Sequence, residues 1–312
     1  MRPPVVLEVP DLRIVSLLPS ATEIVCALGL TNALVGISHD CDYPPAVSGK
    51  PMLSQAIITG DLSSGEVDRR IREQLHQGLS VYHLDQVQLA QLVPTLILTQ
   101  ELCEVCAPSF SLVKAVARIA ASDSRIVSLE PHGLDDILET IRLVGDLTGA
   151  AEHSLALVAT LRAHIERVRG AVAGRLRPTV ICLEWLDPLF VAGHWVPEMV
   201  DLAGGSDVLG RPRAHSYTID WPAVLEADPD VLVLMPCGFD LRRTRDEASG
   251  LMDRTGWREL RAVRSGRVYV TNGTAYFNRP GPRIVDGLEI LGAILHPEAV
   301  SWALPENGFE SL

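Results

Sequence analysis

The feature that most constrains the fold is the segment 150–172, AAEHSLALVATLRAHIERVRGAV, near the middle of the chain. Between Gly149 and Gly170 it contains neither glycine nor proline. Its large apolar residues recur at steps of three and four, at Leu155, Val158, Leu161, Ile165, Val168 and Val172. This spacing places them on one stripe of an α-helix, which at about 1.5 Å per residue is roughly 30 Å long. We therefore predict a single long helix at the centre of the chain.

The sequences before and after this helix resemble one another. Three pairs of segments correspond in the order of their predicted elements: 13–30 with 178–205, 89–106 with 224–240, and 124–149 with 266–297. A period this long is not that of a solenoid repeat. It predicts two similar α/β lobes with central, mainly parallel sheets, joined by one backbone helix. We expect an N-terminal lobe over 12–149, the linking helix over 150–173 and a C-terminal lobe over 174–312.

Length, charge and the N-terminal residues exclude several classes of protein. The 312 residues are enough for two domains with a core each. A net charge of −12 argues against nucleic acid as a partner, because phosphate contacts need a basic face. No run approaches the roughly 20 apolar residues of a membrane span. The opening MRPPVVLEVP lacks a charged leader followed by a long apolar run, so we expect a cytoplasmic protein with reduced cysteines.

Residues that follow the predicted strands are rich in aromatic, thiol and carboxylate groups. In the first lobe these residues include Ser20, His39, Asp40, Cys41, Tyr43, Cys103 and Cys106. In the second lobe they include Glu184, Trp185, Phe190, His194, Trp195, Cys237, Gly238, Phe239, Tyr276, Phe277 and Arg279. Ligands bind beyond the carboxyl ends of strands in doubly wound sheets. We expect a cleft between the lobes that suits a large flat or metal-containing ligand. Ser20 and Glu23 also fit an S-x-x-E capping box for a helix over 21–28.

Several motifs resemble those of one protein family. They are LLPSATEIVCALGL, VGISHDCDYPP, the PTLILTQ strand, EWLDPLFVAG, LAGGSDVLG and GRVYV followed by AYFNRPGPR. Together they resemble the vitamin B12-binding proteins of ABC importers and, more broadly, the helical-backbone (class III) substrate-binding proteins for iron–siderophore, haem and cobalamin. The resemblance covers roughly residues 13 to 297. It implies two lobes joined rigidly by one helix, with the ligand held between them.

The same resemblance implies which residues contact the ligand. The positions that correspond to the family's cleft are Ser20, the loop His39–Tyr43, Phe190, Gly193, Gly238, Tyr276 and Phe277. Aromatic contact with a corrin would come chiefly from Tyr276 and Phe277. The chain departs from the family in lacking an export signal, in a polar insertion around 59–88, and in its thiols at Cys41, Cys103, Cys106 and Cys237.

Cys103-x-x-Cys106 is the sharpest local motif. Such a pair can be half of a zinc or iron–sulfur site, a redox pair, or two loop cysteines without special chemistry. Cys41 and Cys237 could supply further metal ligands from neighbouring loops, with His39 or His194 as substitutes. Alternatively, a cysteine or histidine here could be an axial ligand to the cobalt of a bound corrinoid.

Three functional hypotheses follow. The first is a cytoplasmic protein that binds cobalamin or a related metal chelate for storage, hand-off or sensing, without a catalytic cycle. The second is an enzyme or metalloprotein on the same scaffold, with a zinc or iron–sulfur centre at Cys41, Cys103, Cys106 and Cys237. The third is an ABC-importer receptor whose true start lies upstream, with a permease as its partner. The chain has no nucleophile elbow, phosphate-binding loop or dinucleotide fingerprint that would favour an enzyme.

Overall fold

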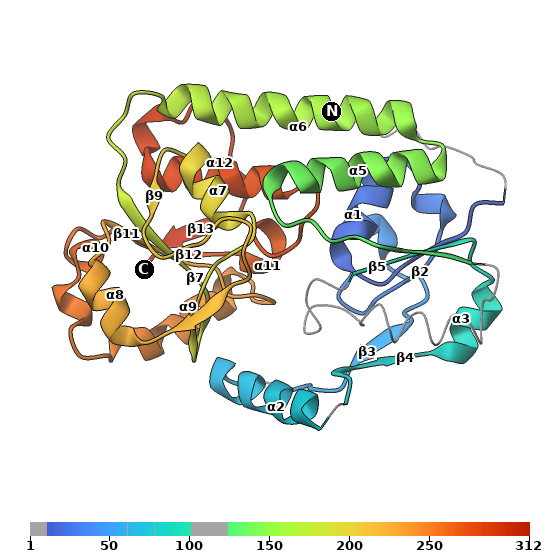
Figure 1. The fold of residues 1–312 in the computed structure, drawn as a ribbon, viewed down its shortest axis with the longest axis horizontal. Helices are drawn as coiled ribbons and strands as arrows, with labels where there is room; N and C mark the ends of the chain where they lie inside the picture. Colours follow the sequence, from blue (N-terminus) through green and yellow to red (C-terminus); the bar gives the residue numbers. More distant parts are fainter. Residues whose placement is uncertain (1–10, 61, 78, 101–123) are drawn as a thin grey trace. The chain divides into compact units, whose positions relative to one another are not determined.

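A computed structural model describes residues 11–60, 62–77, 79–100 and 124–312 (Figure 1). The chain divides into two compact units. The N-terminal unit comprises Met1–Leu62, Arg69–Pro131 and Asp136–Ala159, and the C-terminal unit comprises Ser63–Asp68, His132–Asp135 and Thr160–Leu312. The long helix predicted at the centre of the chain is confirmed as α6, Ala151–Val172, whose residues from Thr160 onward belong to the C-terminal unit.

The N-terminal unit is built on a four-stranded parallel sheet in the order β2-β1-β5-β6. Its strands are β1 (Ile14–Ser16), β2 (Leu34–Ile37), β5 (Leu96–Thr99) and β6 (Arg125–Ser128). Every residue of β1 and β5 is buried, as expected for central strands of a parallel sheet with both faces covered. Apolar side chains of this sheet form a core with the hairpin described next, including Val15, Leu53, Leu84 and Ile97.

Besides the first helix, the described residues up to 148 form three α-helices and a small hairpin. The helices are α2 (Ser64–His76), α3 (Gln86–Leu92) and α5 (Leu134–Thr148), and the hairpin pairs β3 (Ser54–Ala56) with β4 (Tyr82–Leu84). The polar helix predicted within 59–88 is therefore present as α2. Its first turn belongs to the C-terminal unit, where Ser64 donates from its amide (3.1 Å) and hydroxyl (2.8 Å) to the Glu247 carboxylate.

The first helix, α1 (Pro19–Ala27), corrects one expectation from the sequence. The predicted capping box is wrong: Leu18 is the N-cap residue, and no side chain caps the helix. Proline suits the first turn because its φ is already helical and its missing amide needs no partner. The helix therefore begins at Pro19, which places Ser20 and Glu23 inside it, where both are buried.

The C-terminal unit contains the larger sheet, in the order β10-β8-β7-β11-β12-β13, with β9 (Ser206–Asp207) also pairing with β7. Its centre is the parallel set β7 (Thr179–Leu186), β11 (Val231–Leu234) and β12 (Val268–Thr271). β11 is buried throughout, as its Val-Leu-Val-Leu sequence predicts. The antiparallel strands at the edges were not predicted: β8 (Leu189–Val191), β10 (Tyr217–Ile219) and β13 (Phe309–Ser311).

Helices cover this sheet. They are α7 (Val196–Leu202), α8 (Trp221–Ala227), α9 (Leu241–Met252), α10 (Arg261–Arg264), α11 (Gly273–Tyr276) and α12 (Ile284–Leu295). α12 is apolar and almost wholly buried, yet it carries Glu289, which is 4% exposed. That carboxylate pairs with Arg167 and with His164 Nδ1 (3.1 Å), both on the part of α6 that belongs to this unit. A buried charge needs such partners, so these ion pairs fix α6 on α12.

Candidate ligand-binding site

The parallel strands of the C-terminal unit bring most of the predicted site residues to one edge. Because β7, β11 and β12 run in the same direction, the residues after them meet at the carboxyl edge of the sheet. Those residues include Glu184 and Trp185 at the end of β7, Cys237 to Phe239 after β11, and Tyr276 to Arg279 after β12. The hairpin β7–β8 adds Phe190 and the turn Gly193–Trp195 to the same edge.

Glu184 is the most perturbed acid at this edge. Burial raises the pKa of its carboxyl from the usual 4.5 to about 7, while hydrogen bonds from the Ser216 side chain and the Gly193 amide act in the opposite direction. Gly193 is required by packing, because a Cβ there would lie 2.4 Å from the Ala214 carbonyl oxygen. The tight passage of residues 214–216 past Gly193 therefore holds Ser216 against the carboxylate.

Three histidine rings lie close to one another, and two of them, His194 and His215, are next in sequence to Gly193 and Ser216. The ring of His194 lies 5.0 Å from that of His215 and 6.3 Å from that of His132, and His132 and His215 are also 6.3 Å apart, measured between centroids. All three belong to the C-terminal unit. Burial, followed by the other two imidazoles, lowers the pKa of His194 from 6.5 to about 4. His194 is therefore uncharged at neutral pH, and its Nδ1 is buried with no hydrogen-bond partner among the described residues.

The backbone at His194 is held in an unusual conformation. Its φ is +51°, in the left-handed region that non-glycine residues rarely adopt. Two backbone hydrogen bonds secure it, from the His194 amide to the Ala214 carbonyl (2.6 Å) and from the Arg213 amide to the His194 carbonyl (2.8 Å). Strain of this kind is maintained only where surrounding structure fixes it, and it is concentrated at functional sites.

The aromatic residues at this edge fall into two groups. Trp195, Phe239 and Phe277 are buried, at 5%, 2% and 1% exposure. Phe239 lies between the Trp185 ring, 5.2 Å away, and the Arg243 guanidinium, 3.8 Å from its centroid. These contacts make the three rings a support beneath the edge.

Trp185, Phe190, Tyr276 and Arg279 are only partly buried. Gly238, with φ +78°, has open space where a side chain would be. These groups leave an aromatic surface with one cationic side chain exposed at the edge. Such a surface can stack against a flat ligand and pair with an anionic substituent.

In the N-terminal unit, the end of β1 and the loop after β2 form a buried polar cluster. Thr22 Oγ1 lies 2.8 Å from Ser16 Oγ and 3.0 Å from Cys41 Sγ, and Ser38 Oγ lies 3.1 Å from the same sulfur. Ser20 is also buried, at 3%. The Cys41 thiol is thus enclosed by hydroxyl groups and is 7% exposed, as is typical of a packed structural cysteine.

His39 and Tyr43 lie in the same loop and are less buried than Cys41. His39 Nδ1 lies 2.9 Å from Ser54 Oγ on β3, and its Nε2 lies 3.4 Å from Asp40 Oδ2. The ring also contacts Tyr82, with centroids 5.5 Å apart. Tyr43 is 42% exposed. Both side chains are therefore available at the carboxyl edge of the N-terminal sheet.

The cysteine-centred hypothesis finds limited support. Cys103 and Cys106 lie outside the described residues. Cys41 and Cys237 are free thiols, in the N-terminal and C-terminal units respectively. Within the described ranges, no group of three or more His, Cys, Asp or Glu residues is arranged to hold a metal ion. Neither zinc nor an iron–sulfur cluster is therefore supported by the part of the chain that can be seen.

Sequence reasoning did not assign site roles to three residues that the structure places here: His132, His215 and Ser216. His132 was recognisable as a residue after the strand at 125–129. His215 and Ser216 lie in the irregular stretch 206–220, which carries no periodic pattern, so only the packing of that stretch against Gly193 reveals them.

Comparison with known proteins identifies the family. The family model described as "Periplasmic binding protein" matches residues 14–275. The chain belongs to the periplasmic binding protein family. A vitamin B12-binding protein of Vibrio cholerae is 25% identical to this periplasmic binding protein over 283 residues, which cover 90% of this chain and 87% of the relative.

Two other relatives extend the comparison. An uncharacterized ABC transporter substrate-binding lipoprotein of Bacillus subtilis is 21% identical over 295 residues, covering 92% of this chain and 80% of the relative. The crystal structure of a periplasmic haem-binding protein from Pseudomonas aeruginosa matches with a TM-score of 0.72 at 22% identity, covering 96% of this chain and 98% of that one. The two-domain α/β fold predicted from the sequence is thereby confirmed.

Relatives of this periplasmic binding protein are named as periplasmic or lipoprotein components of ABC transporters, so the comparisons do not support the cytoplasmic location expected from the sequence. Among the described residues, none of the helices has the length and apolar character needed to cross a membrane.

Proposed function

We propose that this periplasmic binding protein binds cobalamin, or a related metal-bearing tetrapyrrole, and delivers it to an ABC permease. The observation that carries the proposal is the similarity to a vitamin B12-binding protein over nine-tenths of the chain. The aromatic carboxyl edge of the C-terminal sheet supports it, because flat macrocycles are bound by stacking on such side chains. Importer receptors act outside the cytoplasmic membrane, and cell fractionation that finds the protein only in the cytoplasm would contradict this role.

The ligand-contacting side chains we propose are those that remain accessible in each unit. In the C-terminal unit they are Trp185, Phe190, Tyr276 and Arg279, with Gly238 allowing close approach. In the N-terminal unit they are His39, Asp40 and Tyr43. Trp195, Phe239 and Phe277 support these residues from beneath.

The proposal also includes a contact between His194 and the ligand's metal. Its imidazole is neutral at pH 7, and its Nδ1 lacks a hydrogen-bond partner within the described part of the chain. A neutral imidazole nitrogen is a good ligand for cobalt or iron. We include axial coordination by His194 in the proposal.

The test is a visible absorption spectrum of purified protein after mixing with cyanocobalamin and desalting, with haemin as a parallel sample. Corrin bands retained near one equivalent are the expected result. A shift of these bands that disappears in His194→Ala would support the axial ligand. If the protein retains haemin but not cyanocobalamin after desalting, haem becomes the proposed ligand. If it retains neither compound, the proposal is overturned.

A further inference from the structure

A second hollow lies at the other edge of the C-terminal sheet. It has a volume of about 720 Å³ and is located where the parallel strands begin. Arg177 precedes β7, Asp230 precedes β11 and Arg267 precedes β12, and all three line the hollow. Because the candidate ligand-binding site is at the carboxyl ends of the same strands, this amino-edge pocket is a separate site within the same unit.

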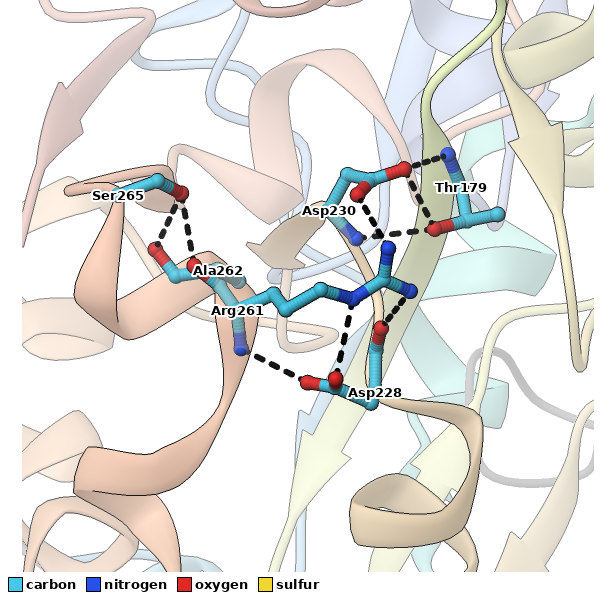
Figure 2. Close-up of polar contacts among 6 residues, drawn as sticks. All are labelled: Thr179, Asp228, Asp230, Arg261, Ala262 and Ser265. Carbon is cyan, nitrogen blue, oxygen red and sulfur yellow. Dashed lines mark hydrogen bonds and ion pairs between the residues drawn. The ribbon is translucent and has the colours of Figure 1, made fainter.

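The pocket is lined by four arginines, Arg177, Arg261, Arg264 and Arg267. The position of Arg261 is fixed by two carboxylates (Figure 2): its Nε lies 3.0 Å from Asp228 Oδ2, and its Nη1 lies 2.8 Å from Asp230 Oδ1. Asp230 in turn accepts hydrogen bonds of 2.8 Å from both the amide and the hydroxyl of Thr179. Asp228 and Asp230, which precede β11, therefore hold this guanidinium in place, and Thr179 at the start of β7 positions Asp230.

Two other arginines are also positioned by the fold. Arg267 donates from Nη2 to the carbonyl oxygens of Ile294 (3.3 Å) and Leu295 (3.1 Å), at the end of α12. Arg177 donates to the Asp201 carboxylate and to the Gly205 carbonyl. Each guanidinium has five N–H donors, so both retain donors after these bonds are made.

Arg264 differs from the other three. It is exposed at the end of α10, and no hydrogen bond or ion pair between its guanidinium and the described residues is found. The three carboxylates that pair with the other arginines, Asp201, Asp228 and Asp230, leave one positive charge of the four uncompensated. This local excess lies in a chain whose net charge is −12.

The walls of the pocket are also partly apolar. Leu176, Pro178 and Leu295 contribute to the lining, and Leu176 is 93% exposed. A leucine this exposed on a pocket wall offers an apolar surface beside the guanidinium groups. The combination fits a ligand with a phosphoryl group at one end and an apolar group at the other.

We propose that the amino-edge pocket binds a small organic phosphate, with Arg264 as the residue that contacts the phosphoryl group and Leu176 against the apolar part. The planar guanidinium fork matches phosphoryl oxygens in geometry and charge. Arg261 and Arg267 are already held at the pocket wall, so ligand binding orders only one long side chain. The site is independent of cobalamin binding.

Isothermal titration calorimetry with phenyl phosphate tests this proposal. Wild-type protein is expected to bind, and Arg264→Gln to bind at least fivefold more weakly. Arg242→Gln is the matched control, because Arg242 is an exposed arginine on α9 that does not line the pocket. Both variants remove an exposed side chain, and both should retain cobalamin if the wild-type protein does.

Absence of phenyl phosphate binding to the wild type, or equal weakening in both variants, would overturn the proposal. Inorganic phosphate should bind more weakly than phenyl phosphate if the apolar wall contributes, and equal affinities would remove Leu176 from the site. Sedimentation with phosphatidylglycerol vesicles distinguishes the source of the phosphoryl group. If the wild-type protein sediments with the vesicles and Arg264→Gln does not, the phosphoryl group belongs to a lipid headgroup. If the wild-type protein does not sediment with them, it belongs to a free ligand.

Discussion

The indole Nε1–H of Trp195 donates a 2.8 Å hydrogen bond to the backbone carbonyl of Phe277. The two residues are 82 positions apart in sequence, and both are buried. Trp195 precedes α7 and Phe277 follows α11, so the bond ties together the segments that follow β8 and β12. Tyr276 and Arg279 lie beside this bond in sequence, and their placement at the carboxyl edge therefore depends on it.

Replacing Trp195 by phenylalanine should destabilise the C-terminal unit. The Phe277 carbonyl would lose its partner inside the protein, and a buried polar group left unsatisfied costs about 1–3 kcal/mol. Urea denaturation followed by far-UV circular dichroism measures the loss. Trp221→Phe is the control, because its indole bonds to the Thr255 carbonyl at an exposed position where water can replace it. Equal decreases in the free energy of unfolding of the two variants would show that the buried hydrogen bond contributes no more than the exposed one.

Glu184 should make the C-terminal unit less stable as the pH rises. Its folded pKa is raised to about 7, so between pH 4.5 and 7 the folded state binds more protons than the unfolded state. Stability contributed by the neutral carboxyl is full below pH 4.5 and declines through that window. In Glu184→Gln the side chain cannot ionise, so the stability should no longer decline between pH 4.5 and 7. Urea midpoints at pH 5 and pH 8 for wild type and variant give the comparison, and parallel pH dependences would contradict the assignment.

His194 should titrate far below an ordinary histidine. Its pKa is lowered to about 4, so the unfolded chain takes up a proton near pH 6.5 while the folded protein does not. The stability that depends on neutral His194 is complete above pH 6.5 and is lost as the pH falls toward 4. Long-range ¹H–¹⁵N NMR of the imidazole measures this directly.

A partner variant separates the causes of that shift. His215→Gln removes one neighbouring imidazole, whose electrostatic effect is the second cause after burial, so the pKa of His194 should rise without reaching 6.5. An unchanged pKa in the variant would mean that burial acts alone. A pKa near 6.5 for His194 in the wild-type protein would show that its imidazole is exposed to solvent.

The architecture of the parallel core followed from local patterns in the sequence. The apolar spacing from Leu155 to Val172 predicts α6, and the Val-Leu-Val-Leu run predicts β11 as a fully buried strand. Both depend on residues close together in the chain. Because parallel strands present their ends at one edge, residues such as Glu184 and Tyr276 could be assigned to a common site from strand positions alone.

What the sequence could not supply are features produced by packing between distant segments. The edge strand β10 and the adjacent His215 and Ser216 lie in a stretch without periodicity, and their position depends on contact with Gly193. Burial likewise distinguishes two adjacent aromatic residues, because Phe277 is buried and Tyr276 is partly exposed. The capping box at Ser20 failed because Pro19 can itself begin a helix, which a motif search does not weigh.

The difference between Tyr276 and Phe277 gives the sharpest test of the ligand site. Phe277 is 1% exposed, so Phe277→Ala should destabilise the protein by about 3–5 kcal/mol through a core cavity. Tyr276 is partly exposed at the carboxyl edge, so Tyr276→Ala should leave the urea midpoint nearly unchanged and weaken cobalamin binding about tenfold, as expected for loss of one stacking ring. Spectrophotometric titration with cyanocobalamin measures the affinity. If Tyr276→Ala binds as tightly as the wild type, the corrin does not stack on this residue, and Trp185 and Phe190 become the rings to replace next.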